Sequence, residues 1–193
     1  MVNDIFKNPI LNCKVSNTET ALEVYKEIRK KNESRKVSNR GGYQSPLLLR
    51  EEREKIFTAE VMKDILEEAI NVYGWKKPVN FNIDGAWFNA NENGDYNISH
   101  RHSRSHFSFV WYLKVPDSSS GQLILEHPDS ALIMTGLFDL ERNDKNHYNS
   151  ELMQITPSEG LMVMFPASLK HRVERYEGQA ARVSLAFNGS FKQ

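Results

Sequence analysis

The part of the chain after Val79 is divided into short extended segments by turn residues, and this pattern restricts the fold more than any other feature. Residues 91–94, 116–121 and 157–160 supply turns rich in Asn, Ser, Gly and Pro. Short strands separated in this way are typical of a β-sandwich or barrel. The pattern predicts strands at 79–90, 97–102, 106–115, 121–126, 131–135, 151–156, 160–165, 170–176 and 181–188.

Two segments before Val79 show helical periodicity instead. Residues 18–32 and 58–73 both place apolar side chains at spacings of three and four. The second segment starts after the capping residue Thr58 and ends before Gly74, which is suited to a helix C-terminus. Two helices are therefore expected to precede the strands.

Two polar segments are expected to form loops. Residues 36–45 contain Gly41-Gly42 and are predicted to border the active site. Residues 136–150 are predicted to form a surface loop.

Together these patterns predict a mainly β protein, a double-stranded β-helix (jelly-roll) barrel with two supporting N-terminal helices. Residues 1–193 are expected to form a single domain, with helical support over about 1–76 and the jelly roll over about 79–190. Because this fold hosts many functions, the function has to be argued from the site.

Composition and charge exclude several classes of function. Lys plus Arg and Asp plus Glu both number 25, so no excess charge favours nucleic acid or an anionic membrane as partner. The single Cys13 excludes an internal disulfide and a four-cysteine zinc site. No apolar run approaches the roughly 20 residues of a membrane span, and the N-terminus lacks an apolar signal stretch. We therefore expect a cytoplasmic protein.

His100 and His102 are the strongest sign of a functional site. Two residues apart on an extended segment, their side chains point to the same side. His171, from a distant strand, would complete one face of a metal ion and leave positions open for a substrate and oxygen, as in non-haem iron sites. Arg182 can bind a carboxylate through a two-pronged contact. This combination indicates oxygenase chemistry.

The alternation of residues after Arg182 supports a role inside the barrel. Arg182 and Ser184 share one face of the strand, whereas Val183, Leu185 and Phe187 share the other and can pack against helices. A buried arginine requires an anion, which a bound dicarboxylate would supply.

Motifs spread over most of the chain carry a family resemblance. They are Trp87-Phe-Asn89, Gly94, His100-x-His102, Ser108-Phe-Val-Trp-Tyr112-Leu, Gly121-x-Leu, Phe165-Pro166-x-Ser168-x-x-His171 and Arg182-x-Ser184-x-x-Phe187-Asn188. They resemble the 2-oxoglutarate- and Fe(II)-dependent oxygenases, and most closely a small group from phages and marine bacteria related to the prolyl hydroxylases. Residues 38–45 also match this group. The resemblance covers about Val37 to Asn188.

The resemblance implies cofactors and site residues. His100 matches the first iron histidine and His171 the distal one, while Arg182 matches the residue that pairs with the far carboxylate of 2-oxoglutarate. Tyr112 stands in the place of a tyrosine that contacts the same carboxylate, and Ser184 faces the same way. The implied reaction uses Fe(II), 2-oxoglutarate and O2 to hydroxylate an unknown small-molecule or peptidyl substrate.

One position departs from the family pattern. His102 stands where the family usually has Asp or Glu, and a neutral imidazole there leaves the site one charge unit more positive. Glu126 on a later strand is one candidate for the missing carboxylate, and His102 itself is the other candidate for the third ligand. The spacing favours His102.

A cupin is the main alternative. Gly94-x5-His100-x-His102 and Gly160-x5-Pro166-x4-His171 are close to the two cupin motifs. However, His106 replaces the glutamate of the first motif, Ser168 stands where glycine is usual, and Arg182 has no role in a cupin. A cupin-type metal enzyme therefore ranks second, and a non-catalytic ligand-binding barrel third.

Three residues are candidates for the substrate pocket: Asn89, Tyr43 and His106. His106 shares strand parity with Tyr112, although a surface position is an equally good interpretation. We expect the substrate to enter past Arg40–Ser45 and the His106 side of the barrel, because loops usually set specificity.

Overall fold

The structure, a computed structural model, describes residues 8–77, 79–129, 136, 139, 141, 146 and 150–192. The predicted strand 131–135 and most of the predicted loop 136–150 lie outside these residues. In chain order the described elements are β1 (Leu11–Lys14), α1 (Glu19–Lys31), β2 (Asn39–Arg40), β3 (Tyr43–Gln44), α2 (Arg50–Ile56), α3 (Ala59–Tyr73), β4 (Asn80–Asn91), β5 (Tyr96–His100), β6 (Phe107–Lys114), β7 (Leu123–Glu126), β8 (Leu152–Ile155), β9 (Leu161–Pro166), β10 (His171–Val173) and β11 (Arg182–Lys192).

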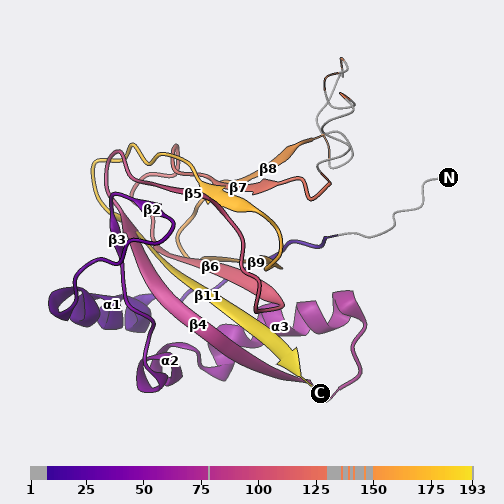
Figure 1. The fold of residues 1–193 in the computed structure, drawn as a ribbon. Coiled ribbons are helices and arrows are strands. Elements are labelled where there is room, and N and C mark those ends of the chain that lie inside the picture. Colours follow the sequence, from indigo (N-terminus) through magenta and orange to yellow (C-terminus); the bar gives the residue numbers. More distant parts are fainter. Residues whose placement is uncertain are drawn as a thin grey trace.

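The strands form two antiparallel sheets, which is the predicted jelly-roll arrangement. The larger sheet has the order β1-β9-β6-β11-β4-β3, and the smaller one has the order β2-β5-β10-β7-β8. Neighbouring strands are mostly far apart in sequence, as β11 between β4 and β6 shows. Figure 1 shows the larger sheet between the smaller sheet and the three helices.

The helices are held against the larger sheet by one side of its strands. In β11 the side chains of Val183, Leu185 and Phe187 enter an apolar core shared with α1 and α3, as the alternation predicted. In β6, Phe109 and Trp111 do the same. This one-sided core leaves the other face of the larger sheet free to line a space between the two sheets.

The helix boundaries agree with the predicted caps. Thr58 precedes α3, and its Oγ1 accepts a hydrogen bond from the amide of Val61 at 3.3 Å. Gly74 ends the helix with a positive φ of 65°. No helix among the described residues combines the length and the apolar character needed to cross a membrane.

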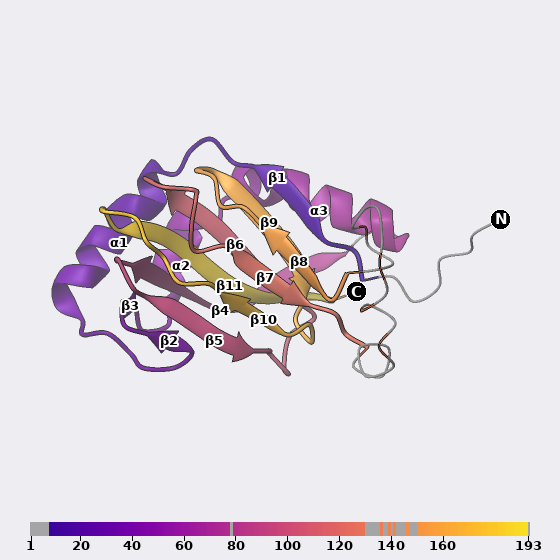
Figure 2. The ribbon, with the colours of Figure 1, turned by 90° about the horizontal axis from the view of Figure 1, so that it is seen from above.

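The structure adds elements that the sequence pattern does not reveal. α2 is a third, mostly polar helix, and β1 extends the larger sheet beside β9. The predicted loop 36–45 contains a small hairpin, β2 and β3, whose tight turn is formed by Gly41 and Gly42 with φ values of 72° and 62°. Figure 2 shows β2 beside β5, at the edge of the smaller sheet.

Candidate metal centre and co-substrate pocket

One pocket lies between the two sheets, and it contains most of the predicted site residues. Its empty volume is about 570 Å³, part of which is open to solvent. The lining residues are Ser38, Trp87, Asn89, Asn91, Asn97, His100, His102, Ser108, Phe109, Val110, Tyr112, Leu123, Phe165, His171, Val173, Arg182, Ser184, Ala186 and Asn188.

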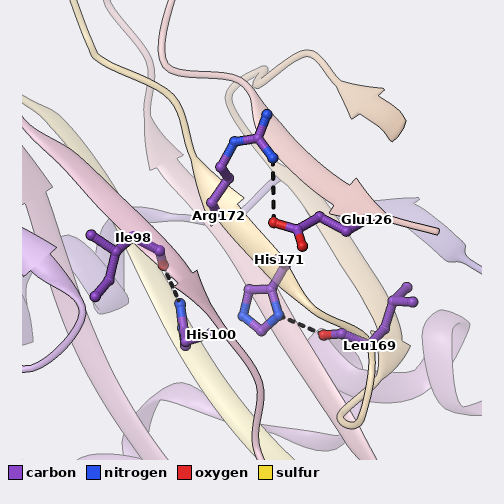
Figure 3. Close-up of polar contacts among 6 residues, drawn as sticks. All are labelled: Ile98, His100, Glu126, Leu169, His171 and Arg172. Carbon is purple, nitrogen blue, oxygen red and sulfur yellow. Dashed lines mark hydrogen bonds and ion pairs between the residues drawn. The ribbon is translucent and has the colours of Figure 1, made fainter. Parts of the chain in front are cut away.

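The three predicted metal ligands meet in this pocket. One ring nitrogen from each of His100, His102 and His171 lies within 4.8 Å of the others. Among the described residues, this is the one group of three or more His, Cys, Asp or Glu side chains that can hold a metal ion. Figure 3 shows the rings of His100 and His171 approaching each other from neighbouring strands.

A β-bulge directs His100 into the pocket. His171 on β10 pairs with His100 on β5, but Val173 pairs with Asn97, so β5 has one extra residue in this interval. The extra residue lets Asn97 and His100 both line the pocket although they are three positions apart. Bulges commonly re-aim side chains near functional sites in this way.

His102 lies just beyond the end of β5 and is held by the backbone. Its amide donates a hydrogen bond to the carbonyl of Ala167 at 2.8 Å, in the turn that leads from β9 to His171. Its ring packs against the indole of Trp87, with ring centroids 5.7 Å apart. The position of His102 is therefore fixed before any metal binds.

Hydrogen bonds at Nδ1 leave Nε2 of two histidines free to bind a metal. Nδ1 of His100 contacts the carbonyl of Ile98 at 2.8 Å, and Nδ1 of His171 contacts the carbonyl of Leu169 at 2.9 Å. Because a carbonyl can only accept, each Nδ1 carries the proton and each Nε2 keeps its lone pair for a metal.

Burial keeps all three histidines neutral. Desolvation lowers the pKa of His171 to about 3 and that of His102 to about 4, and it also lowers the pKa of His100. Mutual repulsion of the rings adds to the effect for His102 and His171. Metals bind neutral imidazole, so the cluster is ready to coordinate at neutral pH.

Glu126, the alternative third ligand, is directed elsewhere. Leu125 pairs with His171 across the sheet, so the next residue, Glu126, points to the opposite face. There its carboxylate accepts a hydrogen bond from Arg172 at 3.3 Å (Figure 3). The structure therefore brings His102, and not Glu126, to the other two histidines.

Arg182 forms the opposite end of the pocket. Only 2% of it is exposed, and burial lowers the pKa of its guanidinium. Nη1 donates to the carbonyl of Gly121 and Nη2 donates to Oδ1 of Asn91 at 3.0 Å, while Nε has no partner. Neither partner is an anion, so the positive charge is uncompensated among the described residues.

Two tyrosines surround this guanidinium. Its Cζ lies 5.9 Å from the ring centroid of Tyr112 and 5.2 Å from that of Tyr176. Tyr176 is fixed by a hydrogen bond from its hydroxyl to the carbonyl of Ala180 at 2.7 Å. Ser184 pairs with Tyr112 across the sheet, and both line the pocket as predicted.

The predicted substrate residues separate into two groups. Asn89 lines the pocket, and its Oδ1 is buried without a hydrogen-bond partner. Tyr43 does not: its ring faces the helices, where it contacts Tyr25 at 6.3 Å. His106 is exposed and accepts a hydrogen bond from the amide of Phe191, outside the pocket. His106 has the same alternation as the pocket-facing Tyr112, but it lies before the start of β6, so the alternation of that strand does not apply to it.

Several functional residues were not predicted from the sequence. Asn91 and Gly121 hold Arg182, and Asn97 and Asn188 line the pocket. Asn91 had a signal, because it lies two residues after Asn89 and shares its face. Gly121 had two signals, its place in a turn and the motif Gly121-x-Leu, but neither indicated a contact with Arg182.

The family of the chain follows from its sequence. Residues 85–188, more than half of the chain, match the family described as "Putative 2OG-Fe(II) oxygenase". The chain belongs to this family. The resemblance predicted from the motifs is thus confirmed, the oxygenase is favoured over the cupin, and Fe(II) and 2-oxoglutarate are its metal and co-substrate. No curated protein is significantly similar to this oxygenase in sequence.

Solved structures confirm the fold. A Pseudomonas putida prolyl-4-hydroxylase is 17% identical with a TM-score of 0.57, covering 94% of this chain and 92% of its own. The viral collagen prolyl hydroxylase of Paramecium Bursaria Chlorella virus-1 is 14% identical with a TM-score of 0.55, at 93% and 94% coverage. The non-heme alpha ketoglutarate dependent epimerase SnoN from nogalamycin biosynthesis is 11% identical with a TM-score of 0.66, at 94% and 77% coverage.

The residues of this oxygenase fit the two groups that the family uses. Three neutral imidazoles with free lone pairs suit a divalent iron ion. The uncompensated guanidinium of Arg182 suits a carboxylate of 2-oxoglutarate. The pocket therefore offers one site for each group.

Proposed function

We propose that this oxygenase is a hydroxylase that couples the oxidative decarboxylation of 2-oxoglutarate to the hydroxylation of a C–H bond, with O2 as the oxidant. The overall reaction balances: one 2-oxoglutarate, one O2 and one R–H give succinate, CO2 and R–OH. His100, His102 and His171 would hold Fe(II), and Arg182 would bind the distal carboxylate of 2-oxoglutarate.

The observation that carries the proposal is the buried charge of Arg182. A cation that is 2% exposed and lacks an anionic partner among the described residues is costly unless a ligand neutralises it. Arg182 shares its pocket with the three histidines. A dicarboxylate fits this arrangement, because one end can pair with Arg182 while the other end reaches the metal.

The chain's own residues bind, orient and shield the co-substrate. Asn91 and Gly121 hold the guanidinium in place, and its Nε has no hydrogen-bond partner among the described residues. Tyr112 is buried beside it and excludes water from this end of the pocket. Pre-set donors of this kind bind a carboxylate without reorganising.

The chemistry of the metal end is supplied by the bound groups: Fe(II) and 2-oxoglutarate together activate O2 for oxidation of the substrate. The protein positions these groups. The bulge in β5, the His102–Ala167 backbone hydrogen bond and the β10 pairing of His171 fix three donors on one side. A metal held by these three histidines would keep coordination positions open for the co-substrate and O2.

The substrate is proposed to be a small molecule or a peptidyl side chain that enters beside the β2–β3 hairpin. The prolyl hydroxylases among the similar folds motivate the peptidyl option. Two observations support the route: Ser38 lines the pocket, and its carbonyl accepts a hydrogen bond from Ile98 on the histidine-bearing β5. The exposed Val37 and Ile98 provide apolar contacts at this edge.

The proposal is tested by the slow conversion of 2-oxoglutarate to succinate that needs no added substrate. Purified protein is incubated with Fe(II), 2-oxoglutarate and O2, and succinate is quantified by mass spectrometry. We expect turnover by the wild type and its loss in His171→Ala and Arg182→Ala. Equal succinate formation in wild type and Arg182→Ala would contradict the assignment of Arg182. Absence of turnover together with tight 2-oxoglutarate binding would favour the non-catalytic barrel.

A further inference from the structure

The charges in the pocket do not balance when the metal and co-substrate are bound. Among the described lining residues there is one permanent cation, Arg182, and no carboxylate. The three histidines contribute no charge, because a histidine coordinates a metal through a lone pair of the neutral imidazole. Fe(II) and Arg182 together carry three positive charges and 2-oxoglutarate carries two negative ones. One positive charge remains, whereas a carboxylate at position 102 would have cancelled it.

The carboxylate of Glu126, on the sheet that carries His100 and His171, does not correct this imbalance. Glu126 lies on the outer face of the smaller sheet and is paired with Arg172 at 3.3 Å. An uncompensated charge in a largely buried site is unfavourable, so an anion that binds next to it is stabilised.

We propose that the substrate presents a carboxylate to the metal end of the pocket, where it supplies the negative charge that His102 does not. This inference rests on the function proposed above. It names the chemical class of the substrate: an organic acid, or a peptide with an acidic side chain or a free C-terminus at the reacting residue.

A second observation places hydrogen-bond donors where such a carboxylate would lie. Ser108 donates its hydroxyl to Oδ1 of Asn188 at 2.8 Å, so the acceptor of this amide is already used. No described residue accepts a hydrogen bond from Nδ2 of Asn188, which lines the pocket. Its two N–H groups remain to donate to a carboxylate oxygen.

The 2-oxoglutarate anchored at Arg182 does not use these donors. Arg182 and Asn188 are six residues apart on β11, which corresponds to about 20 Å of extended strand. A five-carbon co-substrate anchored at one end does not reach the other. The end of the pocket formed by Trp87, Ser108 and Asn188 is therefore left for the substrate.

Acetate and acetamide provide matched probes, because they have nearly the same shape and differ in charge. The protein is loaded anaerobically with Fe(II) and saturated with 2-oxoglutarate, so that Arg182 is already occupied. Each probe is then titrated by calorimetry into the wild type, His102→Asp and His102→Gln. The aspartate restores the negative charge, and the glutamine keeps the position neutral as a control.

We expect the wild type to bind acetate at least tenfold more tightly than acetamide. One charge unit about 6 Å away, at an effective dielectric constant of about 20, corresponds to roughly a hundredfold, which solvent reduces. The preference should fall at least tenfold in His102→Asp and persist in His102→Gln. In Asn188→Leu, acetate binding should weaken while binding of Fe(II) and 2-oxoglutarate is unchanged.

The outcomes separate this inference from the proposed function. If the wild type binds Fe(II) and 2-oxoglutarate but does not prefer acetate, the carboxylate proposal is wrong and the oxygenase assignment stands. If it binds neither group, both are wrong. Should the His102 variants fail to hold Fe(II), the comparison of the two probes in the wild type still decides.

Discussion

Arg182 offers the sharpest test of the co-substrate site, because its charge and that of the ligand can be removed separately. Arg182→Met deletes the buried guanidinium with little change in volume. 2-Oxobutyrate has the same 2-oxo acid group as 2-oxoglutarate but lacks the distal carboxylate. The two changes, made singly and together, form a double-mutant-type cycle. Each change removes the contact between the guanidinium and the distal carboxylate, so the coupling energy of the cycle measures that contact.

The expected magnitude follows from the surroundings of Arg182. The side chain is 2% exposed and its Nε is unpartnered, so the contact with a carboxylate is desolvated. Removing one partner of a buried, hydrogen-bonded charge pair costs about 2–5 kcal/mol. The dissociation constant for 2-oxoglutarate should therefore rise roughly 30- to 5,000-fold. Arg182→Lys should recover only part, because an ammonium does not reproduce the planar fork.

Anaerobic calorimetric titration of both 2-oxo acids into the Fe(II)-loaded proteins measures the cycle. The wild type should bind 2-oxoglutarate roughly 30- to 5,000-fold more tightly than 2-oxobutyrate. In Arg182→Met the two acids should bind within tenfold of each other. If the variant keeps the full preference for 2-oxoglutarate, another residue binds the distal carboxylate and the reasoning is refuted.

The stability of the metal-free protein provides the control. Arg182→Met removes an unpaired buried charge, which is stabilising, but it leaves Oδ1 of Asn91 and the carbonyl of Gly121 without their donor. These effects oppose each other, so the free energy of unfolding should change by less than about 2 kcal/mol. A much larger loss, measured by urea denaturation, would assign Arg182 a structural role instead.

Three further predictions concern the same pocket. His171→Ala should abolish stoichiometric Fe(II) binding in anaerobic titration, whereas His106→Ala, which removes an exposed histidine outside the pocket, should leave it intact. Gly121→Ala should weaken 2-oxoglutarate binding, because its Cβ would lie 2.5 Å from Nη1 of Arg182; Gly74→Ala, with a similar positive φ but no atom within 4 Å, should lower stability without this effect. The free energy of unfolding of the metal-free protein should fall as pH drops from about 7 toward 4, since the unfolded histidines take up protons below their ordinary pKa of 6.5 while His102 and His171 stay neutral down to about 4 and 3. Urea denaturation across this range should show a flatter profile in a His102→Gln/His171→Gln variant, and an unchanged profile would contradict the pKa shifts.

Side-chain alternation explains why much of the fold and site was predictable from the sequence. Along β11 the order of residues after Arg182 separates a pocket face from a core face, and the structure confirms both. The same reasoning predicted that the side chains of His100 and His102 lie on the same side, and the structure brings them together. Periodicity works here because the larger sheet has one face on the helices and the other on the pocket.

Alternation fails where the strand is irregular or where both faces are buried. The bulge in β5 places Asn97 and His100 on one face, which strict alternation forbids. Tyr43 was assigned to the pocket, but its short strand β3 turns it toward the helices. α2 escaped prediction because its sequence, Arg-Glu-Glu-Arg-Glu-Lys-Ile, has no apolar stripe.

The geometry at position 102 and the charge at position 102 have separate origins. The backbone hydrogen bond to Ala167 places the residue, and it does not depend on which side chain is present. A carboxylate or an imidazole can therefore occupy the same place without moving His100 or His171. What changes is the electrostatic balance of the pocket, which in this oxygenase is left to Arg182 and to the anions that bind. The choice of histidine at this position is thus a constraint on the charge of the ligands rather than on the shape of the site.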